Sequence, residues 1–301
     1  MQPKPFLKWA GGKTQLLKQM SHFFPRELEY GKIKTYIEPF VGGGAVFLYL
    51  ATNYNIENIF ISDINPELVL AYKTIQCDVE ELILSLMRIE NKYLSLQYPE
   101  REKYFYYIRG QFNSLRNQID LQKYNLAWIE RTAQLIFLNR TCFNGLFRVN
   151  STGDFNVPIG RYIRPKICHA DNLRSVAQIL QKTYIYQGDF STCENFIDRN
   201  TFIYFDPPYK PISKTSNFTS YSQHRFDDCE QIRLRNFFKL LDTQNVKLLL
   251  SNSDINHQDN QDNFLENAYS DYRIERVKAN RSINSDTSRR KSINEILIMN
   301  Y

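Results

Sequence analysis

Three short apolar runs in this chain each end in an acidic residue that glycine or proline soon follows. They are Thr35–Glu38, Ile59–Asp63 and Thr201–Asp206. Apolar, β-branched and aromatic runs of this length, closed by Gly or Pro, are typical of buried parallel strands. A helical stretch, Ala45–Leu50, separates the first two runs. Together these segments predict a strand–turn–helix–strand unit.

Later segments follow the same pattern. We expect strands over Thr183–Asp189 and Val246–Ser251, helices over Asn172–Gln181 and Asp228–Leu241, and a terminal antiparallel pair, Tyr272–Val277 with Glu295–Asn300. The predicted fold is therefore α/β, an open, mostly parallel Rossmann-like sheet with helices on both faces.

Residues 77–165 have a different character. Glu80–Tyr93 and Asn125–Leu138 carry apolar residues at helical spacing. In residues 139–162, two stretches of alternating character flank Asn150–Gly153, which predicts a β-hairpin. We therefore expect residues 1–76 and 166–301 to form one α/β domain. Residues 77–165 would be inserted into it as a helical domain that carries the hairpin.

The charge and the cysteine content indicate which partners and which cellular compartment to expect. The 301 residues carry a formal net charge of +6, which suits a polyanionic partner but is common among soluble proteins. The five cysteines form no CxxC pair, so they predict reduced thiols in the cytoplasm and neither a zinc knuckle nor a redox pair. No apolar run approaches the roughly 20 residues that span a membrane, so no membrane partner is expected.

The turn after the first strand has the character of a ligand cradle. Glycines at 42–44 let the backbone approach a nucleotide-like ligand, but the G-x-G-x-x-G spacing of a pyrophosphate cradle is absent. Glu38 suits a cationic ligand better than a phosphate, and Asp63 is placed to accept hydrogen bonds from ribose hydroxyls. S-adenosylmethionine (SAM) fits, because it has a ribose, an adenine and a sulfonium but no phosphate. Taken singly, the glycines are as consistent with a tight turn, and Asp63 with a helix N-cap.

The N-terminal stretch Phe6–Lys13 is too rich in glycine for a helix interior and precedes a helical segment, Thr14–Phe23. Trp9, which stands close to these glycines, would wall a ligand pocket. A plain loop tucked onto the core is the alternative.

The tetrapeptide Asp206–Tyr209, at the end of its strand, carries the chemistry. The lone pair of the adenine N6 amine is delocalised into the ring, so the amine is a poor nucleophile. The Asp206 carboxylate and the Pro207 carbonyl can each accept one N–H from it, while the prolines fix φ and remove competing donors. Tyr209 offers an aromatic face on which an extruded base can stack. The alternative is that this tetrapeptide is only a turn that ends the strand and has no catalytic role. Two other strand ends of ligand-binding character at the same edge argue against this alternative.

With these residues the chain resembles the Dam-type, α-class (D12) DNA adenine N6-methyltransferases over nearly its whole length. The motifs stand in the family's order: Phe6–Lys13, Tyr36–Gly44, Ser62–Asn65, Asn139–Tyr162, Gly188–Phe190, Asp206–Tyr209, Asn217–Tyr221 and the basic stretch Arg281–Lys291. The resemblance implies a SAM-binding catalytic domain with an inserted target-recognition domain. It also implies direct in-line methyl transfer to N6 of an adenine flipped out of duplex DNA, without a covalent intermediate.

The resemblance assigns roles residue by residue. Catalysis falls to Asp206, Pro207, Pro208 and Tyr209. Binding of SAM falls to Trp9, Ala10, Gly11, Lys13, Glu38, Pro39, Phe40, Gly42, Gly44, Asp63, Asp189, Phe190 and Asp206. DNA binding falls to Lys8, Arg140, Phe143, Asn144, Leu146, Arg148, Pro158 and Arg161. Among these, Asp189 and Phe190 would hold the adenine of SAM, and Arg140 and Arg161 would meet phosphates.

Within the hairpin, Phe143 would insert into the base stack near the flipped adenine. Arg148 suits a guanine, because its fork can bond O6 and N7 together. Leu146 and Pro158 would give apolar contacts. These side chains match those with which family members read GATC, so GATC is the expected target. Without the motif, each arginine would be taken as a solvated surface charge.

Two other functions stay open on the sequence. A related enzyme would methylate RNA or cytosine N4, although Ser or Asn often replaces the first residue of the tetrapeptide in such groups. A protein that kept the fold but lost catalysis would only bind DNA, although no group needed for catalysis looks missing. No metal is expected, and a monomer is the default. Whether a cognate restriction endonuclease is a partner stays open.

Overall fold

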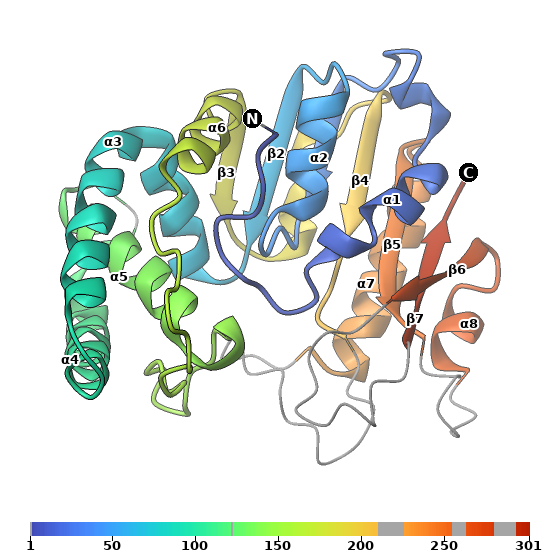
Figure 1. Cartoon of the computed structure of the whole chain (residues 1–301). Coiled ribbons are helices and arrows are strands. Elements are labelled where there is room, and N and C mark those ends of the chain that lie inside the picture. Colours follow the sequence, from blue (N-terminus) through green and yellow to red (C-terminus); the bar gives the residue numbers. More distant parts are fainter. Residues whose placement is uncertain (1, 122, 210–225, 255–262, 280–292) are drawn as a thin grey trace.

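The computed structural model describes residues 2–121, 123–209, 226–254, 263–279 and 293–301. These residues form a seven-stranded sheet in the order β3-β2-β1-β4-β5-β7-β6 (Figure 1). The strands are β1 (Thr35–Glu38), β2 (Asn58–Asp63), β3 (Thr183–Gln187), β4 (Thr201–Phe205), β5 (Lys247–Ser253), β6 (Arg273–Ala279) and β7 (Ile293–Met299). Neighbouring strands are parallel except β7, which runs antiparallel to β5 and β6. The predicted α/β fold and its terminal antiparallel pair are confirmed.

The strand register brings the acidic strand ends together. Thr35 of β1 lies opposite Asn58 of β2 and opposite Thr201 of β4. Because these parallel strands start level, their carboxyl ends lie along one edge, at the bottom of Figure 1. Ligands of open α/β sheets bind outside this edge.

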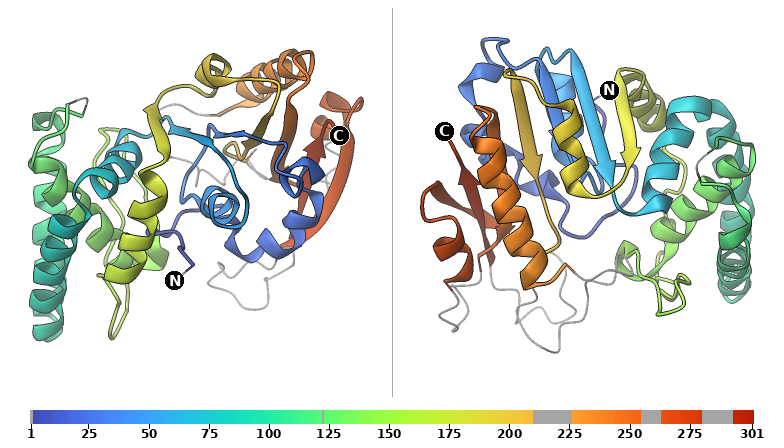
Figure 2. Two further views of the ribbon diagram at one scale, coloured as in Figure 1. Left: turned by 90° about the horizontal axis from the view of Figure 1, so that it is seen from above. Right: turned by 180° about the vertical axis from the view of Figure 1, so that it is seen from behind.

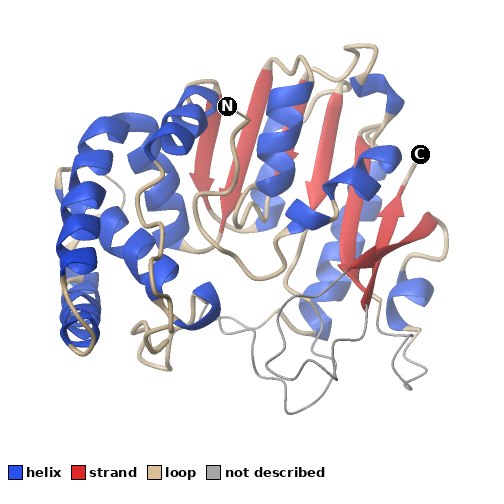
Figure 3. Cartoon of the chain, viewed as in Figure 1, coloured by secondary structure: helices blue, strands red, loops and turns tan. Residues whose placement is uncertain are grey.

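Helices cover both faces of the sheet, as predicted (Figure 2), and Figure 3 marks the helices in blue and the strands in red. They are α1 (Leu17–Met20), α2 (Ala45–Asn53), α3 (Pro66–Ser95), α4 (Glu100–Ser114), α5 (Ala127–Thr141), α6 (Ala170–Leu180), α7 (Asp228–Asp242) and α8 (Phe264–Ala268), with 3₁₀ turns η1 (Lys13–Gln15), η2 (Ser21–Phe23), η3 (Arg26–Leu28), η4 (Arg116–Gln118), η5 (Phe143–Gly145) and η6 (Phe190–Phe196). Alternation along β1 sends Tyr36 into the core on the side of α2, α3 and α6, and Ile37 into the core on the side of α7.

Helix α3 begins earlier than the expected Glu80–Tyr93. The side chain of Asn65 accepts hydrogen bonds from the N–H groups of Glu67 and Leu68, which caps the helix directly after β2. The helix then bends at Asp78, whose backbone is non-helical (φ −141°, ψ 57°). Periodicity in the sequence therefore located only the part of α3 beyond the bend.

The expected hairpin in residues 139–162 is present only as two isolated antiparallel bridges. Cys142 pairs with Ile159, and Val149 pairs with Phe155 around a turn, but no continuous ladder joins them. Pro158 has no N–H to donate, and Gly145 lies in the left-handed region at φ 65°. These residues give a folded-back loop in place of the two regular strands that the alternating pattern predicted.

A buried ion pair joins α5 to the start of α3 and also contacts α4. Arg131 of α5 donates to both carboxylate oxygens of Glu67 at the start of α3. It also donates to the carbonyl of Phe112 in α4 and lies 3.6 Å from the centre of that ring. The side chain of Arg131 is 1% exposed, so the three helices meet around one desolvated charge.

Arg131→Met should lower the free energy of unfolding by about 3–5 kcal/mol, because Glu67 would stay buried without its partner. Urea unfolding followed by circular dichroism measures the loss. The matched control is Arg174→Met, since Arg174 pairs with Glu80 at an exposed site, and exposed pairs contribute about 0–1 kcal/mol. Equal small losses in both variants would contradict the assigned role of the buried pair.

Candidate active site

The strongest contact at the carboxyl edge joins the N-terminal segment to the end of β4. Lys13 Nζ lies 2.6 Å from Asp206 Oδ1 and 2.7 Å from Oδ2. The same ammonium group donates to the carbonyl of Gly11 and to Tyr209 Oη, at 2.8 and 2.6 Å. The side chain of Lys13 is only 2% exposed, so its charge is committed to these partners.

The Asp206 carboxylate has a second support that the sequence did not single out. Ser251 Oγ of β5 donates to Asp206 Oδ1 at 3.1 Å, and the Tyr204 hydroxyl lies 2.7 Å from Ser251 Oγ. Burial raises the pKa of Asp206, while Lys13 and Ser251 oppose that rise by stabilising the charged form. The carboxylate is therefore fixed from two directions before any substrate arrives.

The glycine turn after β1 is tied directly to Asp63. Gly42 N donates to Asp63 Oδ2 at 3.1 Å, and the Tyr72 hydroxyl donates to the Gly42 carbonyl at 3.0 Å. A Cβ at Gly44 (φ 72°) would lie 2.5 Å from the Tyr72 hydroxyl, and one at Gly42 would lie 2.9 Å from the Trp9 ring. A side chain at either position would be strained and crowded, and the Trp9 ring packs against the turn; that Trp9 walls a ligand pocket stays a prediction.

The acidic residues of β1 and β2 have different surroundings. Asp63 also accepts the N–H of Asn65 at 2.9 Å, and burial raises its pKa to about 6. Glu38 is 2% exposed and accepts the Tyr36 hydroxyl at 2.6 Å. Burial raises the pKa of Glu38 well above its ordinary value. Glu38 thus lies beneath the glycine turn rather than open at its surface.

Asp189, expected to hold an adenine, is paired with an arginine that the sequence analysis missed. Arg233 of α7 donates to both Asp189 oxygens, at 2.8 and 2.6 Å. Its guanidinium also lies 4.0 Å from the centre of the Phe190 ring. Hydrogen bonds from Arg233 lower the pKa of Asp189 to about 2, so this group stays ionised. Phe190 packs against Phe40, with ring centres 5.5 Å apart.

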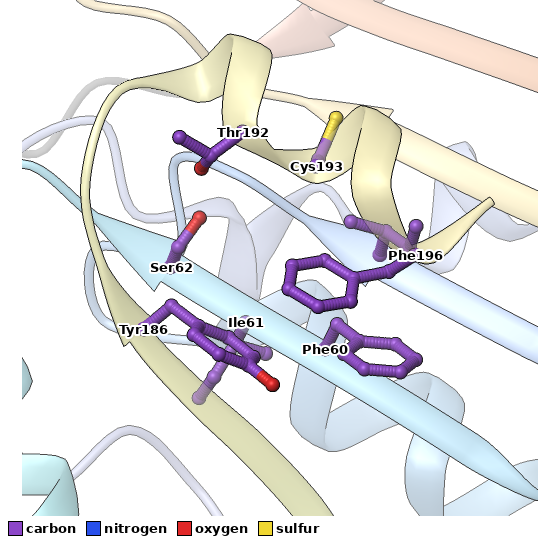
Figure 4. A pocket seen from close by; sticks show the side chains of 8 residues that line it. Phe60, Ile61, Ser62, Tyr186, Thr192, Cys193 and Phe196 are labelled. Atoms are coloured by element: carbon purple, nitrogen blue, oxygen red, sulfur yellow. The ribbon is translucent and has the colours of Figure 1, made fainter.

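A small pocket lies beside this subsite, between β2 and η6. It is lined by Ile37, Phe60, Ile61, Ser62, Tyr186, Thr192, Cys193 and Phe196. Figure 4 shows the hydroxyls of Ser62 and Thr192 at one end and the rings of Phe60, Phe196 and Tyr186 at the other. None of its lining residues was among the predicted site residues.

The N-terminal strap, residues 4–12, is held by side chains from α5 and α6. Asn139 accepts from Lys8 N at 2.8 Å and donates to its carbonyl at 2.9 Å. Asn172 makes the same pair of bonds with Lys4, at 2.8 and 2.9 Å. Arg140 donates to the Phe6 carbonyl at 2.7 Å. Arg140, expected at a phosphate, is therefore turned inward against the strap.

The other residues expected to touch DNA lie on or next to the folded-back loop. Lys8 Nζ reaches Tyr162 Oη at 3.3 Å, and a Cβ at Gly145 would lie 2.2 Å from Lys8 Cδ. Arg148 Nε donates to Asn156 Oδ1 at 2.7 Å. The exposed positions are Lys8, Phe143, Asn144, Pro158 and Arg161, with Leu146 and Arg148 half-buried.

Trp9 links this loop to the glycine turn. Its ring stacks on Phe147 with centres 5.4 Å apart and an interplanar angle of 22°. No role for Phe147 was expected from the sequence. The strap thus contacts both the expected cofactor site and the expected recognition loop.

Across the parts of the chain that the structure describes, no group of three His, Cys, Asp or Glu residues could hold a metal ion. Within the same ranges, no helix is both long and apolar enough to cross a membrane. The motifs Asn217–Tyr221 and Arg281–Lys291 lie outside the described residues.

Known methyltransferases are similar to this chain over nearly its whole length. The family model for D12 class N6 adenine-specific DNA methyltransferases matches residues 9–283. A protein named Type II methyltransferase M.MjaIII, from Methanocaldococcus jannaschii, is 48% identical over the full length of both chains. Type II methyltransferase M1.LlaDCHI, from Lactococcus lactis subsp. cremoris, is 36% identical and covers 99% of this chain and 95% of its own.

A protein named DNA adenine methylase, from Haemophilus influenzae, is 33% identical over 98% of this chain and 92% of its own. Among solved structures, a precorrin 8w decarboxylase from Methanobacterium thermoautotrophicum aligns over both whole chains, but its TM-score of 0.38 and 9% identity are too low to support an argument. The family match and the identities with the methyltransferases place this protein: the chain belongs to the D12 class N6 adenine-specific DNA methyltransferases.

Proposed function

We propose that the protein transfers a methyl group from SAM to N6 of an adenine flipped out of duplex DNA, and that its target is GATC. The observation that carries the catalytic part is the Asp206 carboxylate, which Lys13 and Ser251 hold beside the Tyr209 hydroxyl. It stands at the sheet edge that also carries the glycine turn and Asp63.

The residues at this edge fit SAM. When bound, SAM supplies an electrophilic methyl group carried on a sulfonium. We expect the Asp63 carboxylate to accept ribose hydroxyls. We expect ionised Asp189, which Arg233 also holds, to accept the amine of the cofactor's adenine. The carboxylates at this edge favour a cationic ligand and would repel a phosphate. Gly42 lets the Trp9 ring pack against the turn, because a Cβ there would lie 2.9 Å from that ring.

In the proposed mechanism the chain's own groups prepare the target amine. One Asp206 oxygen and the Pro207 carbonyl each accept an N–H from N6, which frees its lone pair for attack. The Tyr209 ring supports the flipped base by stacking, worth about 1–3 kcal/mol per base. As N6 gains positive charge, the fixed Asp206 carboxylate stabilises it without having to reorganise. The N6 proton that is hydrogen-bonded to this carboxylate is then lost to solvent, which leaves neutral N6-methyladenine.

Lys13 affects this step in two ways. Its charge opposes the effect of burial and favours the ionised form of Asp206, which is the form that accepts an N–H. Lys13 Nζ lies within hydrogen-bonding distance of both oxygens, which holds the carboxylate in place while its remaining lone pair accepts the amine.

For DNA reading, the exposed face of the loop supports the proposal. The Phe143 side chain is 48% exposed, as a residue that enters a base stack must be. Asn156 fixes the plane of the Arg148 guanidinium through its Nε, which suits bidentate recognition of guanine. Arg161 is exposed and available to a phosphate.

Two relatives are named Type II methyltransferases. These names favour a role for this chain in protecting DNA from a partner restriction endonuclease. We propose that the enzyme acts on DNA as a monomer in the cytoplasm.

Asp206→Asn should reduce methyl transfer by at least about 100-fold, because the amide presents an N–H donor and loses the negative charge. Radiolabelled SAM with a GATC duplex, followed by nucleoside analysis, measures N6-methyladenine directly. Asp171→Asn, at an exposed position on α6, is the matched control and should be as active as the wild type. Methylation by Asp206→Asn at the wild-type rate would rule out the catalytic proposal.

The affinity for SAM should fall as the pH drops through about 6. Burial raises the pKa of Asp63 to about 6, so the free enzyme gains a proton there and loses the carboxylate that the ribose needs. Calorimetric titration of SAM across this pH range measures the effect. Asp63→Asn should bind SAM weakly and without this pH dependence. If the dependence persists in the variant, another group, such as Glu38, causes it.

Arg148→Ala and Arg161→Ala should affect DNA binding differently. Loss of Arg148 should cost about 1–3 kcal/mol of discrimination at one base pair. Loss of Arg161 should weaken binding to all duplexes alike and reduce the salt dependence by about one phosphate contact. Binding to GATC and to singly substituted duplexes at several salt concentrations separates the two. A uniform loss from Arg148→Ala would contradict its assignment as a base reader.

A further inference from the structure

The loop Asp206–Tyr209 can form few backbone hydrogen bonds of its own. Pro207 and Pro208 have no N–H groups, so two successive residues of the loop cannot donate backbone hydrogen bonds. The carbonyls of the loop must find donors elsewhere, because an unpaired buried polar group costs about 1–3 kcal/mol. The geometry of the loop therefore depends on side chains from neighbouring elements.

One such donor comes from α7. Gln231 Nε2 donates to the Pro208 carbonyl at 3.1 Å. Gln231 is 2% exposed, and α7 crosses the back of the sheet beside β4 and β5, as the right-hand view of Figure 2 shows. Among the described residues, none donates to the neighbouring carbonyl of Pro207, which is the carbonyl proposed to accept the amine.

The orientation of the Gln231 amide is set by a chain of hydrogen bonds that begins in β5. Ser253 N donates to Asn252 Oδ1 at 2.8 Å, so the other end of that amide must be the Nδ2 donor. Asn252 Nδ2 lies 3.4 Å from Gln231 Oε1. The Gln231 Nε2 group is thereby turned towards Pro208. Asn252 is fully buried, so water does not compete for these bonds.

We propose that Gln231 is a positioning residue for methyl transfer, which sets the place of the Pro208 carbonyl and with it the Pro207 carbonyl and the Tyr209 ring. The inference rests on the proposed catalytic role of Asp206. Ser251 fixes the loop at the Asp206 side chain, and Gln231 fixes it two residues further on. The groups that would hold the amine lie between these two supports. Displacement of catalytic groups by about 1 Å can cost a factor of about 100 in rate.

The test compares Gln231→Leu with Gln231→Glu in the full-length enzyme. The control is Gln244→Leu, the same chemical change at an exposed position just beyond α7. Gln231→Leu should reduce the single-turnover rate of methyl transfer about 10- to 100-fold at saturating SAM and DNA. The dissociation constants of SAM and of DNA should stay unchanged, and so should the rate of the control. A reduced affinity with an unchanged rate would overturn the proposal.

Gln231→Glu separates positioning from packing. The protonated carboxyl can donate to the Pro208 carbonyl as the amide does, whereas the carboxylate only accepts and would repel it. The rate of this variant relative to the wild type should therefore rise as the pH falls. Gln231→Leu should show no such recovery. A ratio for Gln231→Glu that does not change with pH would overturn the proposal, even if Gln231→Leu were too unstable to assay.

Asp206→Asn, measured beside these variants, keeps the two proposals distinguishable. If Asp206→Asn is inactive and Gln231→Leu has the wild-type rate, the positioning role alone is wrong. If Asp206→Asn is active, the catalytic proposal on which this inference rests is wrong. Urea unfolding of each variant identifies any loss of rate that follows from loss of folded protein.

Discussion

The proposed active site depends on the contact between the Lys13 ammonium group and the Asp206 carboxylate, at the carboxyl edge of the sheet. This contact places one positive charge against the Asp206 carboxylate in surroundings that are nearly closed to water. Burial still outweighs this pairing, because the pKa of Asp206 stays raised. The negative charge would therefore be expensive to keep without the lysine. Lys13 directly follows the strap, and the strap places Trp9 against the glycine turn and Lys8 against the folded-back loop that we propose reads DNA.

Much of the fold could be predicted because its strands are short, apolar and closed by special residues. The prediction for Thr35–Glu38 was confirmed at both ends, and the other strands were placed to within a few residues. The alternating pattern in residues 139–162 was less reliable. There, proline and glycine leave two bridges where a ladder was expected. The sequence indicates which residues alternate, but tertiary packing determines whether they pair.

The residues of the candidate site also fall into two groups, those that the sequence indicated and those that it did not. Sequence motifs identified the residues that carry the proposed chemistry, because that chemistry restricts the residue type at each strand end. They missed Ser251, Gln231 and Arg233, whose importance arises only from what lies beside them in the folded chain. One signal was available: β5 changes from apolar Leu248–Leu250 to polar Ser251–Ser253 at the functional edge, although these polar residues are buried.

The hydrogen bonds by which Asn139 and Asn172 hold the strap limit when the strap can dock during synthesis. The strap is synthesised before its partners on α5 and α6, which follow it by more than a hundred residues. Asp206, the partner of Lys13 directly after the strap, follows later still. The strap must therefore wait undocked until the helices that hold it have been made. Its docking brings Trp9 against the glycine turn, so a nascent chain has no finished wall at the proposed cofactor site until most of these residues have been synthesised.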